Sequence, residues 1–330
     1  MPRLHEWCPA LRETLPHVRL GASPTPVRPL PGLGEGPAEV WLKDEGAFGD
    51  GGWGGNKVRK LEWLIPEARR RRRRTVLTFG GLGTNWGLAT ALYAREHGLG
   101  AALALVDQPV DDHVRAQLAR LRESGAALHL TRTKARTALA LPWLLARHSG
   151  GGRPPLVLPA GGSSPVGVLG YVEAALELAA QVEAGELPEP GCVVVPVGTG
   201  GTAAGLLLGL GLAGLPTRVV GVVVNDQLRL DRRTVLRLAG RCADLLARRG
   251  APRPPAIPPE RLLLRREWLG PGYGHPLPAA ASARDEAAER AGLALDPVYT
   301  AKAMAGLLAM DRAGALGPGP ALFLDTNGPR

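Results

Sequence analysis

The stretch CVVVPVGTGGTAAGLLLGL, Cys192–Leu210, joins two apolar runs through a glycine-rich turn. The first run, Cys192–Val197, predicts a strand covered on both faces, and the second predicts a helix. In the intervening GTGGT segment, glycines allow backbone N–H groups to turn toward one point, and the helix N-terminus adds partial positive charge. The segment lacks the Lys-Ser/Thr ending of a nucleoside-triphosphate loop and the spacing of a dinucleotide fold. It therefore predicts a phosphate cradle or, alternatively, a simple tight turn.

The same strand-to-helix pattern recurs on both sides of this stretch. Further strands are predicted at Glu39–Lys43, Thr75–Phe79, Ala101–Val106, 156–162 and 218–224. Helices are predicted from about residue 58 to 65, 85 to 97, 112 to 124, 166 to 184 and 231 to 249, and from 202 onward. This alternation predicts an α/β fold of parallel strands with helices on both faces.

Length and charge limit the classes of function. With 330 residues and 45% hydrophobic content, the chain can bury a full core as one large domain or two. A net charge of +10 and the run Arg69–Arg74 raise the hypothesis of nucleic-acid binding. Alternatively, the run ends a helix, where cations suit the dipole, just before a strand. Because no DNA-binding motif accompanies it and only 4% of residues are aromatic, we expect no nucleic-acid partner.

The sequence predicts a cytoplasmic protein without a membrane partner. Its first residues carry charges throughout and have no signal-peptide-like apolar region, and the longest apolar run, Ala203–Leu215, is too short to span a bilayer. The cysteines, Cys8, Cys192 and Cys242, have no paired or metal-like spacing. We therefore expect a reducing compartment and no metal site.

A second glycine-rich stretch, GGWGGNKVRKLEWL at Gly51–Leu64, leads through Lys57 into a helix. A solvated first-turn lysine is the simplest interpretation. However, a helix terminus contributes at most ~2 kcal/mol, whereas micromolar retention of a ligand needs about 8 kcal/mol. The cradle therefore needs a charge partner or a covalent tether, and Lys57 and Lys60, on one helix face, offer both.

Four segments in order carry a family resemblance: GGNKVRKLEWL, PAGGSSPVGVLGYVEAALELA, VGTGGTAAGLLLGL and LDPVYTAKAM. Together they resemble the D-cysteine desulfhydrase and 1-aminocyclopropane-1-carboxylate deaminase family, which are pyridoxal-phosphate enzymes of the tryptophan-synthase-β-like fold. The matches run from about Thr25 to Thr326. The resemblance implies two open parallel-sheet domains, with 60–168 as a small domain inserted into a larger one of 1–59 and 169–330, and it suggests a homodimer.

The resemblance also implies roles for individual residues. Lys57 matches the lysine that forms the Schiff base with the cofactor aldehyde and later shuttles the substrate proton. Lys60 matches a lysine near the cofactor phosphate, and Asn85 matches an asparagine beside the ring hydroxyl. The phosphate loop is matched by Gly198, Thr199, Gly200, Gly201 and Thr202.

Three further residues bear on the reaction. Tyr273 and Tyr299 resemble active-site tyrosines that orient substrate or move protons; without the family, they would be read as core tyrosines. The resemblance implies that Thr300 lies next to the pyridine nitrogen of the cofactor, at a position where the deaminase pattern has a glutamate and the desulfhydrase pattern has a threonine. Because loss of a β-leaving group tolerates the weaker electron sink, Thr300 favours elimination over ring opening.

The chain departs from the family at several positions. Thr84, a candidate catalytic residue, replaces the usual serine, and Trp86 replaces the usual Gln or His, so a larger side chain is expected to face the substrate. Asp325 and Asn327 stand where an HTGG-like segment is expected. These departures put the substrate in doubt more than the cofactor.

The expected function is β-elimination from a small amino acid such as D-cysteine, giving a 2-oxo acid, ammonia and a leaving group such as sulfide. Three alternatives remain open: ring opening of 1-aminocyclopropane-1-carboxylate, β-replacement by a second nucleophile, and a catalytically weak protein that binds pyridoxal phosphate.

Overall fold

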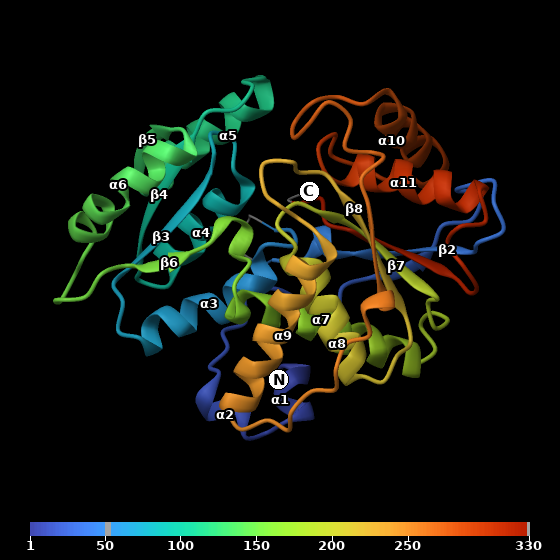
Figure 1. The fold of residues 1–330 in the computed structure, drawn as a ribbon, viewed down its shortest axis with the longest axis horizontal. Coiled ribbons are helices and arrows are strands. Elements are labelled where there is room, and N and C mark those ends of the chain that lie inside the picture. Colours follow the sequence, from blue (N-terminus) through green and yellow to red (C-terminus); the bar gives the residue numbers. More distant parts are fainter. Residues whose placement is uncertain (50–53, 329–330) are drawn as a thin grey trace.

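The computed structural model describes residues 1–49 and 54–328, apart from the side chain of His113, and contains two sheets that lie side by side (Figure 1). The larger sheet has the strand order β1-β2-β10-β7-β8-β9, and the smaller has the order β5-β4-β3-β6. The strands are β1 Val27–Pro29, β2 Val40–Asp44, β3 Thr75–Gly81, β4 Gly100–Val106, β5 Ala127–Arg132, β6 Leu156–Leu158, β7 Cys192–Val197, β8 Arg218–Val223, β9 Leu262–Arg265 and β10 Ala321–Asp325.

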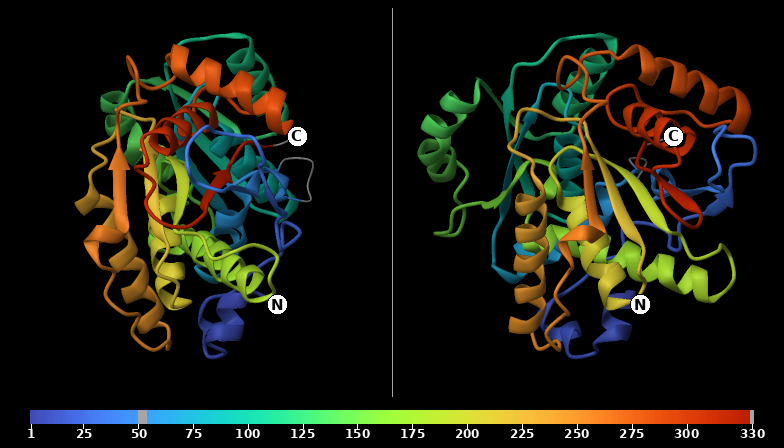
Figure 2. Two further views of the ribbon diagram at one scale, coloured as in Figure 1. Left: turned by 90° about the vertical axis from the view of Figure 1, so that its right-hand side faces the viewer. Right: turned by 45° about the vertical axis from the view of Figure 1, so that its right-hand side comes forward.

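Helices cover both faces of each sheet. They are α1 Arg3–Trp7, α2 Leu11–Thr14, α3 Val58–Arg70, α4 Asn85–Glu96, α5 Asp112–Glu123, α6 Lys134–Arg147, α7 Pro165–Glu183, α8 Gly201–Leu212, α9 Arg232–Arg248, α10 Pro278–Ala291 and α11 Thr300–Arg312. On the larger sheet, α10 and α11 lie on one face and α7, α8 and α9 on the other (Figures 1 and 2). The predicted α/β architecture is thus confirmed.

Pairing in the sheets is parallel except at one edge. β1 pairs with β2 antiparallel, whereas every other ladder between the described strands is parallel. The short connection between β1 and β2 explains the exception, because a parallel pair needs a crossover of a dozen or more residues. β1 is an edge strand that the sequence did not predict, and the prediction of parallel strands is confirmed for the other ladders.

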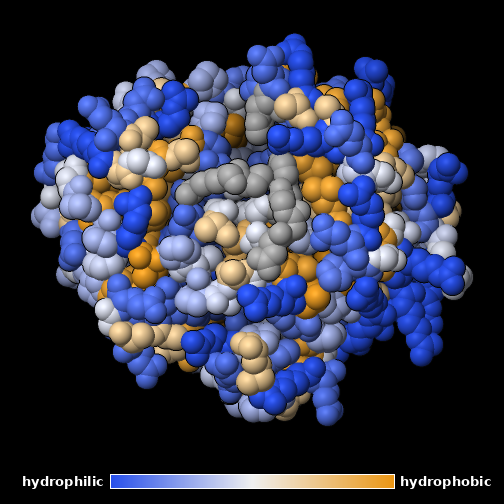
Figure 3. Space-filling view, turned by 180° about the vertical axis from the view of Figure 1, so that it is seen from behind, coloured by the Kyte–Doolittle hydropathy of each residue, from blue (hydrophilic) through white to orange (hydrophobic). Residues whose placement is uncertain are grey.

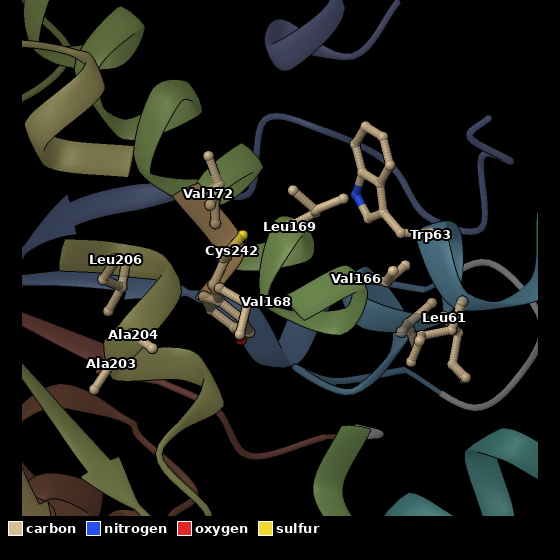
Figure 4. Close-up of a cluster of buried hydrophobic side chains, with 14 of the residues drawn as sticks. Leu61, Trp63, Val166, Val168, Leu169, Val172, Ala203, Ala204, Leu206 and Cys242 are labelled. Carbon is tan, nitrogen blue, oxygen red and sulfur yellow. The ribbon is translucent and has the colours of Figure 1, made fainter. Parts of the chain in front are cut away.

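The main core lies where α3, α7, α8 and α9 meet. Figure 4 shows Leu61 and Trp63 of α3 beside Val166 and Leu169 of α7, with Cys242 of α9 in the same cluster. The apolar helix α8 is buried along most of its length and packs against α7, where Gly205 and Gly209 permit close approach. This core fixes the first turns of α3, α7 and α8 relative to one another.

The predicted small-domain range, 60–168, contains all strands of the smaller sheet. Its boundaries fall inside α3 and α7, both of which belong to the main core, and they stay a prediction. Among the residues that the structure describes, no helix is both long and apolar enough to cross a membrane.

The arginine run Arg69–Arg74 begins in the last turn of α3 and ends just before β3. Glu67, one turn earlier, binds Arg70 at 2.7 Å and Arg71 at 2.6 Å. Part of the run therefore forms intrahelical ion pairs at a helix C-terminus, as the alternative to nucleic-acid binding requires.

The face of the molecule opposite to that in Figure 1 carries hydrophilic side chains around scattered apolar areas (Figure 3).

Candidate active site

The N-terminus of α3 carries two lysines next to each other in space. Lys57 is the N-cap residue, and Lys60 lies in the first turn, where the helix dipole disfavours cations. Burial lowers the pKa of Lys57 to about 8, against an opposing increase from Asp296. A useful fraction of this amine is therefore uncharged and nucleophilic near neutral pH. The expected glycine approach at Gly51–Trp53 lies outside the described residues.

Lys60 lies at the glycine loop that precedes α8. Its side chain is 1% exposed, and its Nζ donates to the carbonyl oxygen of Gly161 at 2.9 Å. Burial, followed by the nearby charge of Lys57, holds the pKa of Lys60 well below its ordinary value. A methyl group on Gly201 would lie 3.1 Å from Lys60 Nζ and 2.5 Å from Ser163 Oγ. Only a glycine leaves room between this lysine and the start of α8.

The site is formed by two glycine-rich turns, one before α7 and one before α8. Ser163 and Thr199 hydrogen-bond through their hydroxyls at 2.6 Å, joining the turn before α7 to the turn before α8. Gly200 has φ +83, which favours glycine, and lets the chain enter α8. A dianionic phosphate fits this setting, because a buried lysine, free hydroxyl capacity and helix N-termini all stabilise negative charge. Sequence reasoning assigned no role to Ser163, although GGSS directly before a helix was the available signal.

The other predicted loop residues line the same turn. Gly198 accepts a hydrogen bond from Asn225 Nδ2 at 3.0 Å, and a methyl group on it would lie 3.1 Å from the Tyr299 ring. Thr202 is buried in the first turn of α8. The loop thus runs from the ring of Tyr299 to the amine of Lys60.

Tyr273 and Tyr299 come together as a hydrogen-bonded pair. Their phenol oxygens lie 2.5 Å apart, and their rings meet edge to face. Lys57 Nζ lies 5.9 Å from the centroid of the Tyr299 ring. Burial raises the pKa of both phenols, and the contact with Tyr273 raises that of Tyr299 further. Both tyrosines therefore stay protonated around neutral pH. One phenol donates to the other, and the proton of the accepting phenol stays available for donation.

Thr300 is fully buried at the start of α11 and is held by Asp296. The Thr300 hydroxyl donates to Asp296 Oδ2 at 2.7 Å, and the backbone N–H of Asp296 donates to that hydroxyl at 2.8 Å. Asp296 also accepts from the backbone N–H groups of Tyr299 at 2.7 Å and Thr300 at 3.0 Å. With its proton committed, the hydroxyl oxygen can accept one more hydrogen bond. Sequence reasoning missed Asp296, although an aspartate shortly before the first residue of a helix is a known start signal.

The residues at the start of α4 are engaged mainly in local structure. The Thr84 hydroxyl accepts from the Gly87 N–H at 3.1 Å as the N-cap, and Asn85 accepts from Gln117 of α5. Trp86 is 3% exposed, and its Nε1 donates to Thr78 at 2.7 Å. The expectation that Trp86 faces the substrate needs correction, because the indole is buried beneath Gly162.

The divergent C-terminal segment lies beside the approach to Lys57. Asp325 ends β10 and accepts from the Asn327 N–H at 2.9 Å, while Asn327 Nδ2 donates to Ala294 O at 2.6 Å. Gly328 packs on the backbone of Gly55, two residues before Lys57. Both substituted side chains thus shape the segment that borders the lysine.

Known proteins share this architecture along nearly the whole chain. A D-cysteine desulfhydrase of Salmonella paratyphi A is 34% identical over 320 residues, which cover 95% of this chain and 94% of that protein. A putative 1-aminocyclopropane-1-carboxylate deaminase of Pyrococcus abyssi is 33% identical over 332 residues, covering 98% and 95%. The crystal structure of an ACC deaminase homologue superposes with a TM-score of 0.79 at 30% identity, covering 99% and 95%.

The family model described as pyridoxal-phosphate dependent enzyme matches residues 18–326, which include the lysines, both glycine turns and the tyrosine pair. The chain therefore belongs to the family of pyridoxal-phosphate-dependent enzymes, and pyridoxal phosphate is its cofactor.

Proposed function

We propose that this enzyme is a lyase that catalyses β-elimination from a small amino acid, with D-cysteine as the first candidate substrate. The products are a 2-oxo acid, ammonia and the β-leaving group, which is sulfide for D-cysteine. Similarity to a protein named D-cysteine desulfhydrase over 95% of the chain supports this substrate class. The observation that carries the reaction type is the neutral tyrosine pair beside a lysine of lowered pKa.

When bound, pyridoxal phosphate supplies an aldehyde that condenses with amines and a ring that accepts electrons from the substrate α-carbon. Lys60, Ser163 and the loop Gly198–Thr202 would hold its phosphate. Lys57 would form the covalent link to the enzyme. Thr300 would lie beside the ring nitrogen, and Asn85 would lie beside the ring hydroxyl, as the family resemblance implies.

Base and acid are supplied by different residues in this proposal. Elimination needs a base at the α-carbon and a proton donor for the leaving group. The Lys57 amine, with a pKa of about 8, suits the first role once the substrate has displaced it. The phenols, whose pKa values are raised by burial, suit the second because they retain their protons at neutral pH.

Ring opening of 1-aminocyclopropane-1-carboxylate is the second candidate. It is supported by the name of the Pyrococcus relative and by the 30% identity to the ACC deaminase homologue. Thr300 argues against it, because a threonine stands where the deaminase pattern has a glutamate, so residue 300 itself supplies no carboxylate.

A turnover panel tests the proposal. The holoenzyme is incubated with D-cysteine, L-cysteine, other D- and L-amino acids and 1-aminocyclopropane-1-carboxylate, with and without added thiol, and the 2-oxo acid, ammonia and sulfide are measured. We expect sulfide and 2-oxo acid in equal amounts from D-cysteine. Thioether formation with added thiol would instead indicate β-replacement, and a spectrally loaded but inert enzyme would indicate a catalytically weak binding protein.

Assembly and location are also part of the proposal. We propose a cytoplasmic homodimer, as the family resemblance suggests. Sedimentation at several protein concentrations tests the dimer, and a monomer under all conditions would refute it.

A further inference from the structure

Lys302 is a buried lysine in an unfavourable position that the reaction proposed above does not use. It lies in the first turn of α11, where the helix dipole disfavours a cation, and its side chain is fully buried. A charge in such a place persists only when specific partners compensate for burial. The contacts of Lys302 must therefore account for a lysine at this position.

The contacts of Lys302 lead to the loop that carries Tyr273. Its Nζ donates to the carbonyl oxygen of Leu269 at 2.7 Å and to that of Gly272 at 3.3 Å. The latter residue precedes Tyr273 directly. One helix thus presents Tyr299 at its N-cap and, one turn later, a cation that holds the partner phenol's loop.

Asp226 holds the same loop from the opposite side. Its Oδ1 accepts from the Tyr273 backbone N–H at 3.1 Å. A methyl group on Gly272 would lie 3.1 Å from Asp226 Oδ2, and the φ of +150 also favours glycine there. The loop carrying Tyr273 is therefore held between the carboxylate of Asp226 and the ammonium of Lys302.

We propose that Lys302 is a positioning residue that, with Asp226, fixes the Tyr273 phenol 2.5 Å from the Tyr299 phenol beside Lys57. It acts on turnover only through Tyr273 and touches neither substrate nor cofactor. This inference rests on the proposed function, in which the phenol pair supplies a proton.

A double-mutant cycle between Lys302→Met and Tyr273→Phe tests the proposal, with kcat, KM and thermal midpoint measured for each variant. We expect Lys302→Met to lower kcat about tenfold and Tyr273→Phe about a hundredfold. In the double variant, Lys302→Met should add almost nothing to the loss. KM should change less than about twofold, because Lys302 does not touch the substrate. Arg28→Met, which removes an exposed cation donating to the Ala291 carbonyl, is the control and should leave kcat unchanged.

Four outcomes would overturn the inference in distinguishable ways. An unchanged kcat in Lys302→Met, or losses that add in the double variant, would refute a role through Tyr273 while leaving the phenol pair intact. An unchanged kcat in Tyr273→Phe would refute the proton role itself and the inference with it. If Lys302→Met does not fold, Asp226→Ala tests the loop from the other side and should reproduce the kcat loss, whereas Asp226→Asn keeps the acceptor and should restore it. Full activity in Asp226→Ala would overturn the proposal.

Discussion

Single residues set the protonation states on which the chemistry depends. Lys57 and Lys60 stand close together at a helix N-terminus, and burial there favours the neutral amine. The same burial raises the pKa of the two tyrosines instead of lowering it, because the neutral form of a tyrosine is the protonated one. One desolvated site therefore holds both a partly uncharged amine and a neutral acid around neutral pH.

The pKa of Lys57 gives a testable pH dependence. Only the uncharged amine condenses with an aldehyde, so the rate at which the apoenzyme takes up pyridoxal phosphate should rise with pH and level off above about pH 8. Asp296 raises this pKa, so Asp296→Asn should shift the midpoint to lower pH. Absorbance-monitored binding at a series of pH values measures both curves. A midpoint near that of free lysine would contradict the burial of this amine.

Local motifs pointed to residues that the structure brings together, but not to the residues that support them. Lys57, Lys60 and Gly198–Thr202 belong to compact sequence patterns, and the structure brings Lys60 and Gly201 together. Lys302 contacts carbonyl groups 30 and 33 residues away in sequence, so no local pattern reveals its partners. Its place in the first turn of a helix, where a cation is unfavourable, was the available signal.

Helix α8 begins in the glycine loop at residues 198–202 and packs along most of its length into the main core. Its first residue, Gly201, faces Ser163 and Lys60, whereas Gly211 near its end has open space around its Cα. The two glycines therefore serve different purposes, since only Gly201 is required by close approach.

The two glycines form a matched pair for mutation. Gly201→Ala should weaken pyridoxal-phosphate binding by about tenfold or more, because the added methyl group would lie 2.5 Å from Ser163 Oγ and crowd the cradle. Gly211→Ala should leave binding unchanged and stabilise the helix by up to about 1 kcal/mol. Cofactor titration and thermal unfolding measure both effects. Equal affinity in the two variants would place the phosphate elsewhere.

Elements with strong apolar runs were predictable, and the rest were not. The buried strand Cys192–Val197 was predicted with its observed bounds, since all its residues are buried. Helix α6 was missed because only Leu144 is fully buried, which leaves no broad apolar face. β10 was missed despite its central position, because its short apolar run contains no β-branched residue that would favour a strand over a helix.

On the scale of the whole molecule, a buried ion cluster ties β2 to α3 and α7. Arg59 Nε lies 2.5 Å from Glu45, Arg59 lies 2.9 Å from Glu177, and Lys43 lies 2.7 Å from Glu177. Arg59 sits between Lys57 and Lys60 in sequence and points to the opposite side, into this cluster. The cluster therefore anchors the helix turn that presents both lysines.

This cluster predicts a loss of stability in acid. Burial alone would raise the pKa of Glu177, but Arg59 and Lys43 lower it to about 2. A lowered folded-state pKa stabilises the protein above the unfolded pKa of about 4.5, and this contribution is lost as pH falls toward 2. The contribution is on the order of 3 kcal/mol. Urea unfolding between pH 2 and 7 measures it.

A variant pair isolates that effect. Glu177→Gln should destabilise the protein by about 3–5 kcal/mol near neutral pH, because two buried cations lose a carboxylate, and it should flatten the acid dependence. Glu183→Gln, at the exposed end of the same helix, should change neither quantity. If the unfolding free energy of Glu177→Gln still falls in acid as that of the unmutated protein does, the pH dependence belongs to other groups.

Borohydride reduction of the holoenzyme, followed by peptide mass spectrometry, tests the assignment of Lys57 most directly. Reduction fixes the bond between cofactor and lysine permanently. We predict one reduced phosphopyridoxyl group per chain, on Lys57, together with loss of both the visible absorption and turnover; the Lys57→Ala variant should carry no label. A label on Lys60 or another lysine, or turnover by Lys57→Ala, would contradict the assignment of Lys57.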